Sequence, residues 1–465
     1  MPITFQNITI TGGLQLVSEG VAPPSGDPDW ANVSLLLNTT STNAQTNNVF
    51  LDSSSSPKTL TVTGTLPQGT FSPFTLSSGY SPSVNGGSGL FSGGQLSFTQ
   101  QSISGDFTAE CWFYRTGNAA GGYSIIFGGD ALSGGGPNCQ LVVYNDGSVA
   151  MILAAAAVIG VSGTAVTTNQ WHHIVWVKSG TSAAIFVDGT RVGTGTTSAN
   201  LVYQVISGAG GVGANYYAQG YLSSCRVVNA AVYNPANSTL TVPTAPLTAI
   251  ANTNLLCNFT NAGMYDAATK SDLISIGSAQ ASTTQAKWSP TSAYFIGSSS
   301  SSLYAPSNTA FAFGTGDFTV EAWVNMSSLT ASPSGTTVPF VQGDAIGGST
   351  NDKWWMGYDG GFLYFGVHNG GPYVRTAFTA STGTWYYVTA VRSSGTMYLF
   401  VNGVSGSLTG VGNFSGYNLG QNGLSVGGFS TPRYLTGYIQ DLRLTKGVAR
   451  YTATFTPPTA ALPTF

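Results

Sequence analysis

Hydrophobic and polar residues alternate in short runs along most of the chain, and Gly, Asn or Ser turns separate these runs. In residues 107–112, the alternation places Phe107, Ala109 and Cys111 on one face of a strand and the three intervening side chains on the other. No segment carries a sustained helical period with capping residues. The pattern therefore predicts an all-β protein made of antiparallel sandwiches.

Four blocks of this pattern occur twice, in the same order, in the two halves of the chain. Residues 105–112, 171–175, 185–189 and 220–227 return as residues 316–323, 385–389, 399–403 and 437–444. Matched blocks in one order indicate a duplicated domain. A residue that both copies share is expected to build the fold, whereas a residue that differs is a better candidate for function.

We predict three segments: an N-terminal arm and linker over residues 1–29, a first sandwich over residues 30–250 and a second over residues 251–465. Each sandwich begins with an apolar strand, residues 33–38 in the first and residues 253–258 in the second. Each ends with a Pro-rich exit. The duplication thus predicts two tandem sandwiches.

The N-terminal arm lies outside the repeat. A β-prone stretch over residues 3–10 is followed by a linker over residues 22–28, in which the prolines favour an extended path. Two interpretations stay open. The stretch pairs as a strand with the first sandwich, or it anchors the protein to a partner.

Charged residues are scarce. Only 7% of the chain is Asp, Glu, Lys or Arg, against roughly 25% in an ordinary soluble protein, and the net charge is -3. This balance gives no electrostatic reason to bind nucleic acid or an anionic membrane. Weak self-repulsion permits dense packing, and we expect a homo-oligomer. The most apolar run, residues 149–161, is too short for a membrane span, which needs about 20 residues.

We expect no signal peptide, because residues 1–4 have no basic region and no long apolar stretch follows. The chain has four cysteines, which is too few for a disulfide framework at this length. Cys111, Cys225 and Cys257 each correspond to an aliphatic residue in the other copy, so we predict buried thiols. Assembly in a reducing cytosol fits these features best.

The repeated blocks resemble the laminin-G-like domains of the concanavalin A-like lectin/glucanase superfamily. The shared elements are a Gly-Asp-Phe-Thr-x-Glu-x-Trp strand, a later Trp that opens a strand, a Phe-Val-Asp/Asn-Gly hairpin and a closing Gly-Tyr strand with an Arg. Residues 442–451, running into residues 455–459, are especially similar to such domains in structural proteins of tailed bacteriophages. The first copy departs from the pattern at residues 229–231. The resemblance implies jelly-roll sandwiches that bind carbohydrate or protein.

Glu110 and Glu321 lie in the middle of the duplicated strand, where the glucanases of the similar superfamily carry catalytic carboxylates. Glycoside hydrolysis uses two carboxyl groups, about 5–5.5 Å apart in retaining enzymes and roughly 6.5–9.5 Å apart in inverting ones. The neighbours on the same face of the strand supply no second carboxylate in either copy. We therefore predict a structural hydrogen-bonding role for both glutamates, and a protein that is not an enzyme.

Other positions shared by the copies are also predicted to be structural. Asp106 and Asp317 are expected to close turns, and Trp171 and Trp385 are expected to lie in the core. The resemblance makes calcium an alternative, but calcium needs several oxygen ligands, and the 17 acidic residues form no cluster. We predict no metal and no other cofactor.

Where the copies diverge, aromatic residues gather in loops. Sugar rings stack on Trp and Tyr, while amides bond sugar hydroxyls, so these loops are the candidate ligand sites. The candidates are Trp354, Trp355, His368, Asn369 and Tyr373 in the second copy and Tyr216 and Tyr217 in the first. The alternative is that one of Trp354 and Trp355 packs in the core while the other caps a loop.

Together these features predict a non-enzymatic virion protein of a tailed phage, assembled in the host cytoplasm. Its sandwiches would face outward and bind glycans of the host surface, and its N-terminal arm would bind other virion proteins. Head decoration and a tail fibre or adhesin are both open. A secreted or cell-surface lectin-like protein is the alternative, and a glycoside hydrolase is the third hypothesis.

Overall fold

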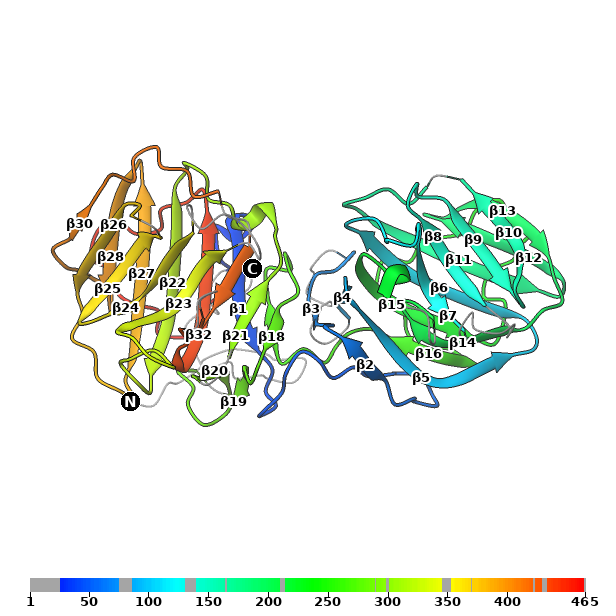
Figure 1. Ribbon diagram of the computed structural model, residues 1–465, viewed down its shortest axis with the longest axis horizontal. Helices are drawn as coiled ribbons and strands as arrows, with labels where there is room; N and C mark the ends of the chain where they lie inside the picture. The colour runs from blue at the N-terminus through cyan, green and yellow to red at the C-terminus, as the bar shows by residue number, and fades with distance from the viewer. Residues whose placement is uncertain are drawn as a thin grey trace, which may run out of the picture.

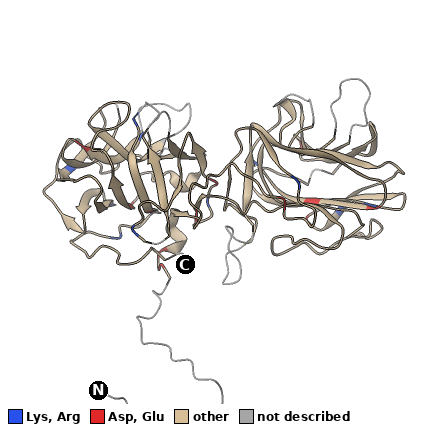
Figure 2. Ribbon diagram, turned by 90° about the horizontal axis from the view of Figure 1, so that it is seen from below, with Lys and Arg blue, Asp and Glu red and all other residues tan. Residues whose placement is uncertain are grey.

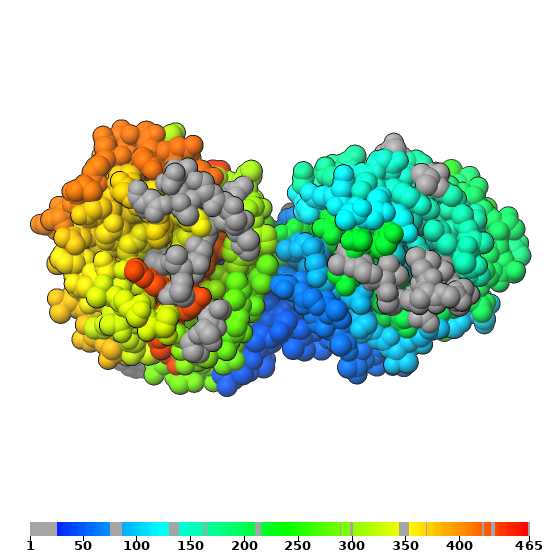
Figure 3. Space-filling view, in the orientation of Figure 1, coloured from blue at the N-terminus to red at the C-terminus, as the bar shows by residue number. Residues whose placement is uncertain are grey.

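A computed structural model of the chain describes residues 26–74, 86–129, 139–163, 165–209, 214–288, 290–297, 301–344, 353–368, 370–420, 423–428 and 433–463. These residues form two β-sandwiches that lie side by side along the long axis of the molecule and meet at a narrow waist (Figure 1; Figure 3). Short 3-10 helices are Trp30–Asn32 (η1), Ala214–Tyr216 (η2) and Thr309–Phe311 (η3). In these ranges, no helix has the length and apolarity to cross a membrane. The predicted all-β fold is confirmed.

Sandwich 1 holds the first copy of the repeat. One sheet has the order β13 (Thr190–Thr196), β12 (Ser182–Val187), β11 (Trp171–Ser179), β6 (Phe107–Arg115), β15 (Gly220–Val228), β4 (Ser88–Phe91), β3 (Gln68–Gly69), and β16 (Thr253–Cys257) also pairs with β15. The other has the order β10 (Ala156–Ser162), β9 (Val149–Leu153), β8 (Gln140–Tyr144), β7 (Tyr123–Gly128), β14 (Leu201–Ile206), β5 (Gly94–Ile103), β2 (Thr61–Gly64). The pairings are antiparallel.

Sandwich 2 holds the second copy. One sheet has the order β17 (Met264–Asp266), β1 (Val33–Thr39), β32 (Thr436–Lys446), β22 (Phe318–Met326), β27 (Trp385–Ser393), β28 (Thr396–Val401), β29 (Val404–Ser405), with β20 (Ser292–Ile296) beside β32 and β19 (Gln280–Ser282) beside β20. The other has the order β18 (Ile274–Ile276), β21 (Ser302–Ala305), β31 (Gly423–Val426), β23 (Thr337–Asp344), β24 (Trp354–Asp359), β25 (Phe362–Val367), β26 (Tyr373–Ala377), β30 (Thr409–Val411).

Each sandwich has its own hydrophobic core between its two sheets. Phe107, Ala109 and Cys111 point into the core of sandwich 1, as the alternation predicts. Phe318 and Val320 occupy the same positions in sandwich 2. The duplicated strand therefore builds the inner face of one sheet in both copies.

The opening strands of the two copies are exchanged. β1 pairs with β32 of sandwich 2, where Leu36 lies opposite Arg443, and β16 pairs with β15 of sandwich 1, where Cys257 lies opposite Cys225. Figure 1 shows β1, in blue, inside the sandwich formed by the yellow-to-red half of the chain. The predicted boundaries, 30–250 and 251–465, thus assign both opening strands to the wrong sandwich, because each strand completes the sheet of the other copy.

Sandwich 1 is inserted into a hairpin of sandwich 2. β1 and β17 are antiparallel neighbours, with Thr39 opposite Met264. The Thr40 backbone N–H donates to the Gly263 carbonyl at 2.9 Å. The chain leaves sandwich 2 after β1, forms sandwich 1, and returns at β17 to the point that it left. Sandwich 2 therefore consists of two segments that are distant in sequence.

Two smaller expectations concern burial. The four cysteines are free and buried, in agreement with the predicted thiols. The apolar run at residues 149–161 forms the paired strands β9 and β10. The two interpretations of residues 3–10 concern a part of the chain outside the described residues.

Candidate functional site

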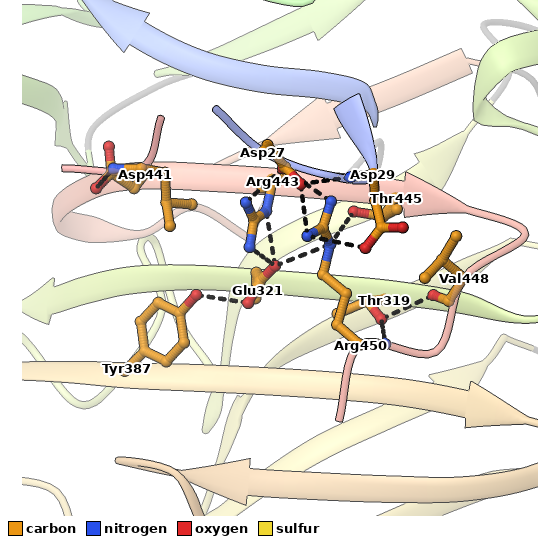
Figure 4. A network of polar contacts seen from close by, with 11 residues as sticks. Asp27, Asp29, Thr319, Glu321, Tyr387, Asp441, Arg443, Thr445, Val448 and Arg450 are labelled. Atoms are coloured by element: carbon orange, nitrogen blue, oxygen red, sulfur yellow. Dashed lines mark hydrogen bonds and ion pairs between the residues drawn. The ribbon is translucent and has the colours of Figure 1, made fainter. Parts of the chain in front are cut away.

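Glu321, the glutamate of the duplicated strand in sandwich 2, is fully buried and forms an ion pair with an arginine. Glu321 lies on the outer face of its sheet, and it accepts hydrogen bonds from Arg443 Nε at 2.8 Å and from the Tyr387 hydroxyl at 2.5 Å (Figure 4). Arg443 Nη2 lies 2.6 Å from the same carboxylate. The side chain of Glu321 has no exposure to solvent. Its contacts agree with the predicted structural role.

The segment before β1 joins this network. Asp27 accepts from Arg443 Nη1 at 2.7 Å and from Arg450 Nη2 at 2.8 Å (Figure 4). Burial raises the pKa of Asp27, but the hydrogen bond from Arg450 and the charge of Arg443 outweigh it and hold the pKa below its ordinary value. The N-terminal segment is thus held on sandwich 2 by charge as well as by strand pairing.

Sandwich 1 has a matching network around Glu110. Arg226 Nη2 donates to Glu110 at 2.6 Å, the Tyr233 hydroxyl donates at 3.0 Å, and His173 lies at 3.2 Å. Burial raises the pKa of Glu110, but the hydrogen bond from His173 and the charge of Arg226 outweigh it and lower the pKa. A general acid for glycoside hydrolysis needs a raised pKa. Glu110 is therefore tuned away from that role.

Asp106 and Asp317 bind turns that are distant in sequence, between β11 and β12 and between β27 and β28, and the predicted core tryptophans are corrected. Asp106 accepts from the Gly180 backbone N–H at 2.7 Å, and Asp317 accepts from the Ser394 N–H at 2.8 Å. Trp171 is half-buried, because alternation from the core residue Ile174 places it on the outer face of β11. Trp385 is half-buried at the matching position of β27.

The predicted aromatic residues of sandwich 2 divide between core and surface. Trp354 lies in the core and stacks on Phe365, so its prediction as a ligand residue is wrong. The alternative is confirmed for the core tryptophan only, because Trp355 lies within β24 and not in a loop. Trp355, on the opposite face, stacks on Tyr364 with ring centroids 4.2 Å apart, and Tyr364 stacks on Tyr373 at 5.0 Å.

The remaining predicted residue of this group that the structure describes is His368, whose ring lies 6.3 Å from that of Trp355. Asn369 lies outside the described residues. Trp355, Tyr364 and Tyr373 form an aromatic row on the outer face of β24, β25 and β26. The row is largely buried at Trp355 and more open at Tyr373.

The predicted tyrosines of sandwich 1 also separate. The Tyr216 ring lies 4.9 Å from that of Tyr123, which lies 5.2 Å from Tyr144. Tyr217 is 8% exposed. This group and the aromatic row belong to different sandwiches, so the structure does not join the predicted residues into one site.

A cleft that the sequence did not reveal lies between the sandwiches. It has a volume of about 430 Å³ and falls in the size range of small-molecule sites. Phe71, Tyr114 and Tyr221 supply aromatic surface from sandwich 1. The Phe71 ring lies 5.0 Å from that of Tyr114, 4.7 Å from that of Tyr221 and 5.1 Å from that of Trp171. We call the three lining residues Phe71, Tyr114 and Tyr221 the aromatic floor.

Polar residues line the other parts of the cleft. The lining includes Thr116 and Asn169 from sandwich 1 and Lys270, Ser307, Asn308 and Thr309 from sandwich 2. Asn308 caps η3 by accepting from the Ala310 N–H at 2.9 Å, and its amide donates to the Lys270 carbonyl at 2.7 Å. These contacts fix the wall opposite the aromatic floor.

Buried hydrogen bonds hold the two sides of the cleft together. Asp272 of sandwich 2 accepts from the Phe71 backbone N–H at 3.0 Å and from the Ser88 hydroxyl at 2.9 Å. The Asn47 amide donates to the Met264 carbonyl at 2.7 Å. Burial raises the pKa of Asp272 well above its ordinary value. The interface therefore positions the aromatic floor directly through Phe71.

Sequence reasoning missed this cleft for two reasons. Phe71 lies outside the repeated blocks, and the polar wall comes from residues more distant along the chain. One signal was present: Tyr114 and Asn325 hold matching positions opposite Trp171 and Trp385, so the copies differ there. The rule that differing positions carry function points to Tyr114.

No group of three or more His, Cys, Asp or Glu side chains that could hold a metal occurs among the described residues. Charged residues of either sign are sparse along the ribbons of both sandwiches (Figure 2). The cleft thus offers aromatic surface, neutral hydrogen-bonding groups and one ammonium group.

Comparisons with known proteins bear on the fold. The family model described as concanavalin A-like lectin/glucanases superfamily, of laminin G type, matches residues 88–235 and 297–449. A comparison with curated proteins gives no significant match.

Solved structures similar to this chain have low identity and low TM-scores. Domains LG4-5 of the mouse laminin α1 chain are 13% identical, with 78% of this chain and 92% of that chain covered and a TM-score of 0.27. The binding domain of paraclostridial mosquitocidal protein 1 is 10% identical, with 38% and 44% covered and a TM-score of 0.31, so this chain spans less than half of it. Domain 4 of the arabinanase AbnA from Geobacillus stearothermophilus, in complex with arabinotriose, is 18% identical, with 37% and 77% covered and a TM-score of 0.28.

Proposed function

The chain belongs to the laminin G-type family of the concanavalin A-like lectin/glucanase superfamily, and from that membership we propose that it is a non-enzymatic, glycan-binding protein of a tailed-phage virion. The cleft between the sandwiches is its binding site. The single observation that carries this assignment is the aromatic floor opposite a wall of neutral hydrogen-bonding residues.

The cleft suits a sugar by its chemistry. An apolar ring face packs on exposed aromatic rings, and sugar hydroxyls bond amides and hydroxyls. Tyr114 and Phe71 are half-buried and keep exposed ring surface, while Thr116, Asn169 and Ser307 are exposed at the rim. A ligand that enters the cleft contacts both sandwiches at once.

Binding without hydrolysis is the function that the glutamates support. Glu110 and Glu321 are each held by an arginine and a hydroxyl group in a site closed to solvent. Neither carboxylate reaches the cleft's lining residues. A hydrolase would need a pair of carboxyl groups beside the bound sugar.

The virion assignment rests on the resemblance of residues 442–451 to domains of tailed-phage structural proteins. The N-terminal arm attaches the protein to other virion proteins, copies associate as a homo-oligomer, and assembly takes place in the host cytoplasm. The sandwiches face outward and bind glycans of the host surface.

Glycan binding is tested with the full chain. We expect the protein to bind a subset of bacterial surface glycans on an array, and Tyr114→Ala to weaken that binding about tenfold, because one lost stacking contact and its buried area are worth about 1.4 kcal/mol. Calorimetric titration of the best array ligand measures the change.

Two matched variants control this test. Tyr123→Ala removes a half-buried tyrosine of sandwich 1 outside the cleft. Trp355→Ala removes one ring of the aromatic row of sandwich 2. Both are expected to bind as the wild type does. An array on which no glycan is bound argues against the proposed function. A loss of glycan binding in Trp355→Ala but not in Tyr114→Ala would show that the binding site is the aromatic row and not the cleft.

The position in the virion is measured by copy number. Quantitative mass spectrometry of purified particles is expected to find the protein in every particle. On the order of hundreds of copies would identify head decoration, and a few copies would identify a tail fibre or adhesin. Particles that lack the protein altogether would refute the virion assignment.

A further inference from the structure

The cleft continues into a second hollow that carries another lysine. This hollow has a volume of about 360 Å³ and is lined by Asn32, Ser34, Ala310 and Lys446, among others. Lys270 lines both hollows, and Thr309 of the cleft precedes Ala310 of the second hollow. The two hollows therefore adjoin at Lys270, and we refer to them together as the groove.

The two lysines of this groove have no carboxylate partner in the described part of the chain. Lys446 Nζ donates to the Thr309 carbonyl at 2.8 Å. Lys270 makes no side-chain hydrogen bond or ion pair to a described residue, and the residue is exposed. Lys58, Arg226, Arg443 and Arg450 each pair with a carboxylate. Other described basic residues bond backbone carbonyls, as Arg191 and Arg392 do.

The groove as a whole is positively charged. No Asp or Glu occurs among the residues that line either hollow. The acidic residues nearest to Lys270 in sequence, Asp266 and Asp272, are fully buried and point their oxygens at backbone N–H groups and at Ser88. Asp29, which precedes the lining residues Ala31 and Asn32, is partly exposed and pairs with Arg450 at 3.4 Å. Burial raises the pKa of Asp272, which favours its neutral form.

We propose that this groove binds an acidic saccharide, with a sugar ring on the aromatic floor and a carboxylate, sulfate or phosphate group of the same or the next sugar between Lys270 and Lys446. This inference rests on the proposed glycan binding and names its ligand class. The ammonium groups attract the anion, and the neutral wall bonds the hydroxyl groups. A neutral sugar would use the aromatic floor and the neutral wall but neither lysine.

The test uses the full chain and two saccharides of equal length, trigalacturonic acid and its neutral counterpart galactotriose. We expect trigalacturonic acid to bind at least about tenfold more tightly in low salt, and its advantage to shrink as salt screens the lysines. Lys270→Met is expected to remove most of that advantage, and Lys270→Met combined with Lys446→Met to remove all of it. The quantity compared between variants is the ratio of the two affinities, so a general effect of Lys270→Met on sugar binding cancels.

Two controls separate this inference from simple ion binding and from misfolding. Lys287→Met removes a lysine of sandwich 2 that lies over Trp323 and lines neither hollow, and it is expected to have no effect. Each variant must unfold at the same temperature as the wild type. If Lys270→Met unfolds at a lower temperature, Lys270→Gln replaces it in the test. Equal binding of polyglutamate and trigalacturonic acid would overturn the inference.

Failure of this inference differs from failure of the proposed function. If both saccharides bind equally and Tyr114→Ala weakens both, the cleft binds sugars and the acidic ligand is refuted. If neither saccharide nor any array glycan binds, the proposed function fails, and the acidic ligand fails with it.

Discussion

Residues 251–465 expressed alone are expected to remain largely unfolded, although they contain the whole second copy of the repeat. This fragment lacks β1, whose side chains Leu35 and Leu37 are fully buried in the core of sandwich 2. Its opposite face buries Val33 and Leu36. Each large aliphatic side chain contributes roughly 1.5–3 kcal/mol by burial, and four of them approach the whole stability of a typical domain. Circular dichroism and thermal unfolding measure the result.

The complementary variant is expected to fold. Because the Thr40 N–H bonds the Gly263 carbonyl, an Asn-Gly turn can replace residues 41–262 and close β1 and β17 into a hairpin. This shortened chain should unfold cooperatively near the temperature of sandwich 2 in the full protein. Cooperative unfolding of residues 251–465 at that same temperature would show that β1 is dispensable and would contradict the exchange.

Replacement of Glu321 by Gln is expected to lower the stability of sandwich 2 by about 3–5 kcal/mol at pH 7. The substitution removes the charge that Arg443 and, at 3.8 Å, Arg450 face in a site without solvent. Arg443 then keeps Asp27 as its carboxylate partner, and Arg450 keeps Asp27 and Asp29. Denaturant unfolding followed by tryptophan fluorescence measures the loss.

Glu110→Gln is the matched variant in sandwich 1, and here the loss of stability is also expected to depend on pH. The pKa of Glu110 is lowered in the folded state, so its ionised form contributes stability that is complete above the unfolded value of about 4.5. This contribution is lost as the pH falls through the folded pKa. Wild type and Glu110→Gln should therefore differ at pH 7 and converge in acid. A constant difference down to pH 2, or variants as stable as wild type, would contradict the buried ion pair.

The alternation of residues predicted the strands well because side-chain direction in a strand depends only on local geometry. Phe107, Ala109 and Cys111 point into a core as expected. The comparison of copies was equally informative for Glu110 and Glu321, since an identical residue without a second carboxylate nearby indicated a structural role. The family, the sandwiches and the buried thiols were all accessible at this level.

The candidate site was less predictable. Trp354 and Trp355 are adjacent, and a strand places them on opposite faces, so only the core contacts decide which one is buried. Trp171 was assigned to the core because both copies share a tryptophan there, but its face is set by its register with β6. Phe71, which joins the aromatic floor, has no counterpart in the repeat that could have drawn attention to it.

The sequence by itself determined that this chain folds as two similar β-sandwiches with few charges, because alternation, turns and duplication are local properties. Only the tertiary structure decided which strand completes which sandwich and where the cleft lies. Residues 33–37 and residues 253–257 are both short apolar strands, and either could in principle complete either sheet. Long-range pairing with β32 or β15 decides between them, and that same pairing brings the two sandwiches together around the cleft.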